Sequence, residues 1–182
     1  HSKLLRIQDQ ACQRLVKISE KIIKLTRAKV DEETIKETYK QDLEHLNKTF
    51  FKPSNGMYIP SDPRKKVLTL DVAKCRYMSS KMVPLWLVFH NADQNGKPIY
   101  LMFKSGDDLR QDMLTLQVLN IMDQIWLQEG LDMRLKPYEV IATGINDHGD
   151  GVGMIQPVIN SDTISGIQLK QGGGAMGALK ED

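Results

Sequence analysis

The densest group of polar side chains in this sequence lies at residues 104–112, directly after an apolar stretch over 98–103. A lysine that ends an apolar strand keeps its stem in the core and its ammonium at the edge of a cleft. Lys104 could therefore serve as a fixed cation for phosphate oxygens, provided that an acid on the neighbouring helix positions it. Asp108 and Asp112 are four residues apart and share one face of the predicted helix. The plainer interpretation is that these acids complement the helix dipole and that Lys104 is exposed.

Two other patterns fit functional motifs formally. Residues 172–177 match Gly-x-Gly-x-x-Gly, but a dinucleotide fold needs a helix after the motif and an acid about 20 residues further on. Only five residues follow Gly177, so we interpret this segment as a flexible connection. Asp147, His148 and Asp150 could suggest a metal site. Because a third well-spaced ligand is missing, we expect a hydrated turn and no metal.

The overall composition predicts a soluble, globular, intracellular protein. The 182 residues are 41% apolar and 26% charged, which excludes wholesale disorder. The net charge of +2 lacks the strongly basic balance of nucleic-acid binders, so no nucleic-acid partner is expected. No stretch approaches the roughly 18 apolar residues of a membrane span, and no leader begins the chain. Cys12 and Cys75 have neither zinc nor redox spacing and are expected to be reduced thiols.

Residues 1–52 form a predicted helical segment with 12 basic and 8 acidic side chains. Over residues 3–29, apolar side chains recur in alternating steps of three and four, which places one stripe on a helix. Asp31 is a predicted N-cap, and a second stripe follows from Ile35 to Phe50. A short connection favours an antiparallel hairpin packed on a neighbouring domain. A coiled coil or a basic membrane-surface helix is the alternative, although three heptads are marginal alone.

The remaining sequence predicts a linker and an antiparallel α+β lobe. Residues 53–66 contain three prolines and predict the extended linker. In the lobe, Asn95-Gly96 is a hairpin signal, and Gly130 is well placed to cap a long helix. The expected elements are strands over 67–73, 84–89 and 98–104, a helix over 108–129 striped from Leu109 to Ile125, and strands over 137–143 and 153–159 joined by a turn at 146–151.

Around Lys104 the sequence resembles the phosphoinositide kinase family, in the motif Gly106-Asp-Asp-Leu-Arg-Gln-Asp-Met113 and in Leu114-Thr-Leu-Gln117 after it. Further similar segments follow the family's order. They are Met78-Ser-Ser-Lys-Met-Val-Pro-Leu-Trp-Leu87, Ile121-Met-Asp-Gln-Ile-Trp126 with Gly130-Leu-Asp132, and Pro137-Tyr138 with Gly153-Met-Ile155. The resemblance covers nearly the whole chain and, through Pro84-Leu-Trp86, favours class I phosphoinositide 3-kinases. It implies the end of a helical domain at 1–52, a linker at 53–66 and the kinase N-terminal lobe at 67–182.

The resemblance also implies an ATP site. Lys104 would hold the α-phosphate end, while Ser79, Ser80 and Lys81 would cover the β- and γ-phosphates. The remaining contacts would come from Asp112 and Tyr138 at the polar back of the pocket, from Met78, Trp86, Met102 and Ile155 around the adenine, and from the hinge at Gln156 and Val158. The family usually has Glu at position 156 and an aliphatic residue at 157, whereas this chain has Gln156-Pro157. The carbonyl of residue 156 and the N–H of Val158, which would contact adenine, survive this departure.

The family's catalytic and metal-binding loops have no counterpart in this sequence, which contains neither Asp-Arg-His nor Asp-Phe-Gly. We therefore expect no catalytic or metal-binding residue here, weak ATP affinity at best, no turnover by the chain alone, and Mg²⁺ ligands in a C-terminal lobe outside it. The resemblance implies a cytoplasmic enzyme that is recruited to membranes and phosphorylates an inositol lipid, with a regulatory subunit and a small GTPase as possible partners.

Two alternatives to this reading stay open. The chain could be a non-catalytic fragment whose helical hairpin binds a partner. It could also be a lobe of a phosphatidylinositol 4-kinase or of a related protein kinase. An Asp-Arg-His and an Asp-Phe-Gly encoded downstream of residue 182 would favour the enzyme over the binding fragment, whereas an early stop would favour the fragment.

Overall fold

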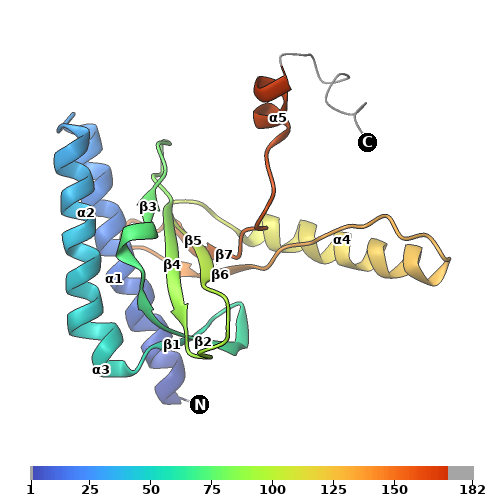
Figure 1. Ribbon diagram of the computed structural model, residues 1–182, viewed down its shortest axis with the longest axis horizontal. Coiled ribbons are helices and arrows are strands. Elements are labelled where there is room, and N and C mark those ends of the chain that lie inside the picture. Colours follow the sequence, from blue (N-terminus) through green and yellow to red (C-terminus); the bar gives the residue numbers. More distant parts are fainter. Residues whose placement is uncertain (1, 172–182) are drawn as a thin grey trace.

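The helical hairpin predicted at the front of the chain is present in the structure, a computed structural model that describes residues 2–171 (Figure 1). Helix α1 spans Ser2–Arg27 and helix α2 spans Glu32–Leu46. The Asp31 carboxylate accepts a hydrogen bond of 2.8 Å from the backbone N–H of Thr34, which confirms Asp31 as the N-cap of α2. A π-helical turn, η1 (Asn47–Phe51), and a short helix, α3 (Lys52–Ser54), follow.

Most of the two predicted apolar stripes is buried. The buried members are Ala11, Leu15, Ile18 and Ile22 on α1, and Ile35, Tyr39, Leu43, Leu46 and Phe50 along α2 and η1. The stripe of α1 begins later than predicted, because Leu4 is 44% exposed. The hairpin packs on the sheet, where the Phe51 ring contacts that of Phe89 edge-on with 5.4 Å between centroids. The predicted helical hairpin therefore packs against the sheet and shares one buried cluster with it.

Seven strands form one antiparallel sheet beside this hairpin. They are β1 (Met57–Ile59), β2 (Asp62–Leu70), β3 (Arg76–Tyr77), β4 (Leu85–Asn91), β5 (Ile99–Ser105), β6 (Val140–Ile145) and β7 (Gly151–Ile155). Their order is β1-β2-β4-β5-β7-β6, with β3 paired to β4, and a 3₁₀ turn, η2 (Val72–Lys74), joins β2 to β3. Helices and antiparallel sheet together confirm the predicted α+β fold class.

The extended linker predicted at residues 53–66 is replaced by structure that belongs to the sheet. These residues contain β1 and the start of β2, joined at Pro60-Ser61 because Ile59 pairs with Asp62. Tyr58, which precedes Ile59 on β1, pairs with Lys66. Residues 63–65 therefore bulge out without a partner on β1. Pro63 falls in this bulge, where its missing N–H breaks no ladder bond. The prolines thus mark a turn and a bulge, and the strand predicted at 67–73 starts earlier and ends at Leu70.

The two predicted hairpins of the lobe are present. Strands β4 and β5 pair from Leu85–Phe103 to Phe89–Ile99, and their connection turns where the Gly96 N–H donates to the Asp93 carbonyl. Strands β6 and β7 are joined by a turn in which Asn146 and Asp150 pair through their backbones. The strands predicted at 137–143 and 153–159 extend too far at their outer ends. Residues 137–139 precede β6, and residues 156–159 follow β7, without strand structure.

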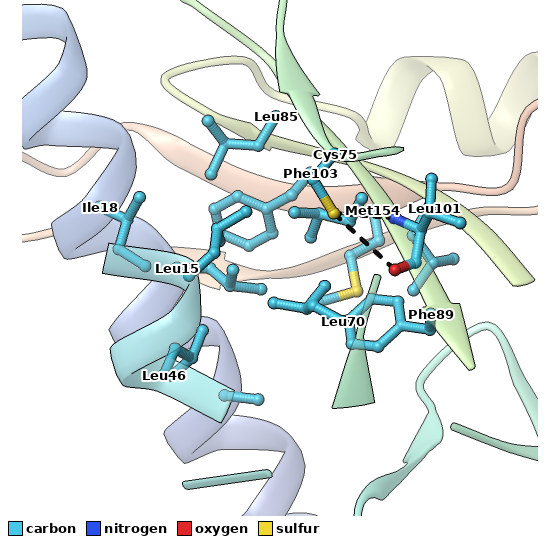
Figure 2. Packing of buried hydrophobic residues seen from close by; sticks show 14 of the residues in the cluster. Leu15, Ile18, Leu46, Leu70, Cys75, Leu85, Phe89, Leu101, Phe103 and Met154 are labelled. Atoms are coloured by element: carbon cyan, nitrogen blue, oxygen red, sulfur yellow. Dashed lines mark hydrogen bonds between the residues drawn. The ribbon is translucent and has the colours of Figure 1, made fainter. Parts of the chain in front are cut away.

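Strand β5 divides the lobe into two faces. Its alternate residues Ile99, Leu101, Phe103 and Ser105 are buried, whereas Tyr100, Met102 and Lys104 are half-buried. Figure 2 shows the buried face, where Phe103 lies toward Leu15 of the helical hairpin, and Leu101 and Leu46 belong to the same buried cluster. The half-buried residues project from the opposite side of the sheet. Lys104 is therefore placed on the face that the helical hairpin leaves free.

The long helix, α4, spans Arg110–Gln128 and projects away from the sheet (Figure 1). Gly130 has φ +78°, and the N–H of Leu131 donates to the Trp126 carbonyl, which confirms the predicted glycine cap as a Schellman motif. The predicted apolar stripe is buried only at its beginning, at Leu109 and Leu116. Ile121 and Ile125, further along, are more than half exposed. Much of the apolar surface on the outer half of α4 is therefore uncovered within residues 2–171.

A last helix, α5 (Ile164–Gln171), was not predicted from the sequence. The glycine-rich connection predicted at 172–177 lies outside the described residues. Within residues 2–171, no helix combines the length and the apolarity that crossing a bilayer requires.

Candidate functional site

Three of the residues expected around the adenine form one row across the sheet. Trp86 on β4 is paired in register with Met102 on β5, and Met102 is paired with Ile155 on β7. Directly paired residues project from the same side of a sheet, so the three side chains lie next to one another. All three are half-buried, on the face opposite the helical hairpin. The structure thus brings together an apolar surface on which a flat ring could lie.

Lys104 lies two residues beyond Met102 on the same face, and its ammonium is 3.0 Å from the Asp107 carboxylate. The Lys104 side chain is 25% exposed, so it is neither buried nor freely solvated. The expectation that an acid on the helix positions this lysine is wrong in detail, because Asp107 precedes α4. Asp108 also precedes α4, and it binds the Arg110 guanidinium at 2.6 Å, which lowers the pKa of Asp108 to about 2.

The start of α4 lies beside Lys104. Lys104 is paired in register with Gly153 on β7, and the side chain of Leu109 packs against Gly153 on that side of the sheet. Leu109 is only 2% exposed. A larger residue at position 153 would meet Leu109 and the backbone of β6. This close approach fixes the beginning of α4 over the row that contains Lys104.

The loop between β3 and β4, residues 78–84, is closed by a hydrogen bond between its two ends and contacts Gly106, two residues after Lys104. The Met78 N–H donates to the Pro84 carbonyl at 2.9 Å, and Val83 adopts a left-handed φ of +45°. The Met82 side chain lies against Gly106, where a Cβ would collide with it. Gly106 has φ +102°, so the turn after Ser105 favours glycine there, whereas the tip of the Met82 side chain could move aside for a Cβ.

The three loop residues expected to cover phosphates, Ser79, Ser80 and Lys81, are exposed at the tip of this loop. Ser79 and Ser80 also line a hollow of about 390 Å³ on the side of the helical hairpin, together with Thr26 and Ile35. Loop residue Met78 is 37% exposed and borders the same hollow. The tip is thus free of packing that would hold it in one position.

Asp112 and Tyr138, expected at the polar back of the pocket, do lie close to each other. Both line a hollow of about 340 Å³ beside the first turns of α4, with Leu116 and Leu119. Asp112 makes no side-chain hydrogen bond or ion pair within the described part of the chain. Its carboxylate is therefore available to a ligand or to another part of the protein.

The hinge predicted at residues 156–158 leaves the two backbone groups that adenine would need without partners. The Gln156 N–H donates to the Glu139 carbonyl at 2.8 Å. Within residues 2–171 the carbonyl of Gln156 accepts no hydrogen bond, and the Val158 N–H donates none. Unpaired backbone groups at the end of an apolar row are what recognition of a flat, polar-edged ring requires.

Several residues that shape this site had not been predicted. The Arg76 guanidinium lies 5.1 Å from the centre of the Trp86 ring, and the side chain of Gln156 contacts Ser61 and Lys65 on the β1–β2 hairpin. The Arg76 contact could have been found from its pairing with Trp86 in neighbouring strands. The Gln156 contacts join residues more than 90 positions apart and leave no local pattern in the sequence.

The turn predicted at residues 146–151 is present between β6 and β7. Around the β6–β7 turn, the Asn146 side chain accepts hydrogen bonds from the backbone N–H groups of His148 and Asp150, which is how a turn is built. Both cysteines are free and buried, and burial raises the pKa of Cys75 to about 11. Residues 2–171 contain no group of three or more His, Cys, Asp or Glu side chains that could hold a metal ion.

Comparison with known proteins identifies the family of this chain. Residues 98–179 match the family described as "Phosphatidylinositol 3- and 4-kinase". The chain is 49% identical over 140 residues to phosphatidylinositol 3-kinase 2 of Dictyostelium discoideum, which covers 77% of this chain and 7% of that protein. It is 37% identical over 170 residues to the phosphatidylinositol 3-kinase C2 domain-containing subunit gamma of Homo sapiens, with 93% and 11% covered.

Residues 98–179 therefore match part of a lipid-kinase family. The chain belongs to the phosphatidylinositol 3- and 4-kinase family, and its relatives include phosphatidylinositol 3-kinases. The chain spans 7–11% of the length of the curated relatives named above.

Proposed function

We propose that this chain is the ATP-binding lobe of a class I-like phosphatidylinositol 3-kinase, an enzyme that transfers the γ-phosphate of ATP to a hydroxyl of an inositol lipid. The observation that carries the proposal is the row Trp86–Met102–Ile155 with Lys104 beside it, on the sheet face that the helical hairpin leaves free. An apolar surface that ends in a fixed cation and in unpaired hinge groups matches the adenine and phosphate ends of ATP.

Each part of the site has a distinct task in this proposal. Lys104, held by Asp107, neutralises charge at the α-phosphate end, and the tip at Ser79, Ser80 and Lys81 closes over the β- and γ-phosphates. The adenine lies on Met102 and Ile155, with its amine donating to the Gln156 carbonyl and its ring accepting from the Val158 N–H. Asp112 and Tyr138 form the polar back of the pocket. Phosphoryl transfer depends on such positioning and charge stabilisation.

In this proposal, the ligands of the metal and the site of the lipid hydroxyl that accepts the phosphate are not among the residues described above. Mg²⁺, where bound, neutralises the phosphates, but residues 2–171 offer no cluster of ligands for it. We propose that the metal ligands, the group that positions the lipid hydroxyl and the lipid-binding surface come from the other lobe of the kinase. Regulatory subunits, small GTPases and recruitment from the cytoplasm to a membrane likewise belong to the whole protein. The chain alone is expected to bind ATP weakly and to have no turnover.

The test compares two lysine variants of the full-length kinase that contains this chain. We expect Lys104→Met to abolish phosphorylation of phosphatidylinositol, because it removes the cation that the proposal places at the α-phosphate. The matched control is Lys97→Met, in the exposed β4–β5 connection, and should keep full activity. Full activity of Lys104→Met would show that the phosphate role is wrong. Lipid phosphorylation by the isolated chain would show that the chemistry does not need the other lobe.

A further inference from the structure

The side chain of Gln156 links the proposed hinge to the far edge of the sheet. We infer that the β1–β2 hairpin holds the hinge through this side chain, so that Gln156 acts as a positioning residue for the adenine of ATP. The inference rests on the proposed ATP site and concerns how its hinge is held in place. It assigns a role to residues 61–65, which form part of the β1–β2 hairpin and contribute nothing else to the site.

Both ends of the Gln156 amide are engaged by this hairpin. Its Nε2 donates to the Ser61 hydroxyl oxygen at 2.8 Å, and its Oε1 accepts from the Lys65 ammonium at 3.4 Å. These bonds join residues 95 and 91 positions apart in the chain. A side chain bonded at both its donor and its acceptor cannot rotate without losing one of them. Gln156, the first residue after β7, is therefore hydrogen-bonded to the β1–β2 hairpin.

The partner residues are themselves fixed. The Asp62 carboxylate is buried, accepts from the Arg64 guanidinium at 2.9 Å and lies 3.1 Å from the Lys65 ammonium. The hydrogen bond from Arg64 holds the pKa of Asp62 well below its usual range, so this carboxylate stays charged. Lys65 therefore bridges the Asp62 carboxylate and the Gln156 amide. Ser61 occupies the two-residue turn that joins β1 to Asp62.

The hairpin is anchored in turn on the helices. The Gln8 amide of α1 donates to the Tyr58 carbonyl of β1 at 2.9 Å. The Asn47 side chain donates to the Leu70 carbonyl of β2 and accepts from the Leu70 N–H, at 2.9 and 2.8 Å. The β1–β2 hairpin is thus held by the helical hairpin on one side and holds Gln156 on the other.

Loss of the Gln156 side-chain hydrogen bonds should affect the binding of adenine and not that of the phosphates. The Gln156 backbone N–H is fixed by Glu139, so the residue's side chain and N–H together set where its carbonyl points. This carbonyl is the group proposed to accept from the adenine amine. Losing the Gln156 side-chain bonds should therefore weaken the adenine contact, while Lys104 and the phosphate loop, on other strands, keep their positions.

The test measures steady-state kinetics of the full-length kinase with Gln156→Leu, Ser61→Ala and Lys65→Met. We expect KM for ATP to rise about two- to tenfold, the effect of one lost hydrogen bond, with kcat within twofold of wild type. KM for inosine triphosphate, which carries a carbonyl where adenine has its amine, should change little. Gln156→Glu should restore the wild-type KM for ATP, because a carboxylate accepts from both the Ser61 hydroxyl and Lys65.

The matched control is Lys66→Met, because the side chain of Lys66 has no polar partner within residues 2–171; its KM should equal that of wild type. Unchanged KM for ATP in all three variants would overturn the inference, as would an equal rise for both nucleotides. Thermal unfolding identifies a misfolded Gln156→Leu protein, and the Ser61 and Lys65 variants then decide the matter. Activity of Lys104→Met would instead count against the proposed ATP site itself, so the two failures are distinguishable.

Discussion

The Lys104 ammonium is held 3.0 Å from the carboxylate of Asp107, a residue in the same strand-to-helix connection, and not by an acid on helix α4. The pair is therefore formed within four consecutive residues. Its geometry does not depend on the angle at which α4 leaves the sheet. The cation proposed to meet the phosphates is already oriented in this lobe.

Removing the partner of Lys104 should weaken ATP binding without abolishing activity. Because the two side chains are 25% and 37% exposed, their ion pair is screened and contributes less than about 1 kcal/mol. We expect Asp107→Asn to raise KM for ATP about two- to threefold in the full-length kinase. Asp108→Asn is the comparison, because Asp108 binds only Arg110, and it should leave KM unchanged. Equal effects of both substitutions would contradict the pairing.

Truncating the centre of the helix–sheet interface should destabilise the fold strongly. Leu15 is fully buried between α1 and the sheet (Figure 2). Leu15→Ala removes buried apolar surface and leaves a cavity, which costs about 3–5 kcal/mol. Leu5→Ala, on the same helix but 63% exposed, should stay within about 0.5 kcal/mol of wild type. Chemical denaturation of the chain measures both, and similar losses would argue against the packing described.

The Asn47 side chain should be a specific connection between the helices and β2. It makes two hydrogen bonds with the backbone of Leu70 in a half-buried position. Asn47→Ala leaves both backbone groups without their partner, which should lower the free energy of unfolding by about 1–3 kcal/mol. Asn120→Ala, on the exposed side of α4, is the control and should have no measurable effect. Thermal unfolding of the two variants provides the comparison.

The buried carboxylate of Asp62 should make stability depend on pH. Its pKa in the folded state is lowered, mainly by the hydrogen bond from Arg64, so the contribution is fully present above the unfolded value of about 4. It is lost progressively as the pH falls below that value. Asp62→Asn should therefore be less stable than wild type at pH 7, by about 1 kcal/mol after allowance for the exposed Arg64.

Thermal unfolding between pH 7 and pH 3 should show the gap between Asp62→Asn and wild type closing at the acid end. A gap that stays constant over this range would mean that the charge of Asp62 contributes nothing.

The sequence predicted the elements whose patterns are local. The two helical stripes, the Asp31 cap, the Gly130 cap and the β4–β5 hairpin each depend on residues within one turn or one strand pair. The β1–β2 hairpin was missed because prolines at a turn and in a bulge look the same in sequence as prolines in a linker. The apolar stripe of α4 was predicted, but its exposure at Ile121 and Ile125 was not, since periodicity reports an apolar face and not whether a neighbour covers it.

For the candidate site, order along the chain placed Trp86, Met102 and Lys104 correctly on neighbouring strands. Whether these residues bind ATP stays a prediction. The acid that pairs with Lys104 was expected on the helix, but Asp107 lies before α4 begins. Helix ends are the least certain boundaries in a sequence. The contacts of Gln156 with Ser61 and Lys65 depend on the order of strands in the sheet, which no local pattern records.

The alternation along β5 restricts where this lobe can change in length. A single residue inserted in β5 ahead of Phe103 would turn the Lys104 side chain toward the helices and Phe103 toward the opposite face. In the connections at 92–98 and 146–150, an added or lost residue would not reverse the side of the sheet that a strand residue faces. These connections could therefore lengthen or shorten freely. Insertions and deletions among homologous lobes should therefore gather in these two connections, and strand β5 should keep one length.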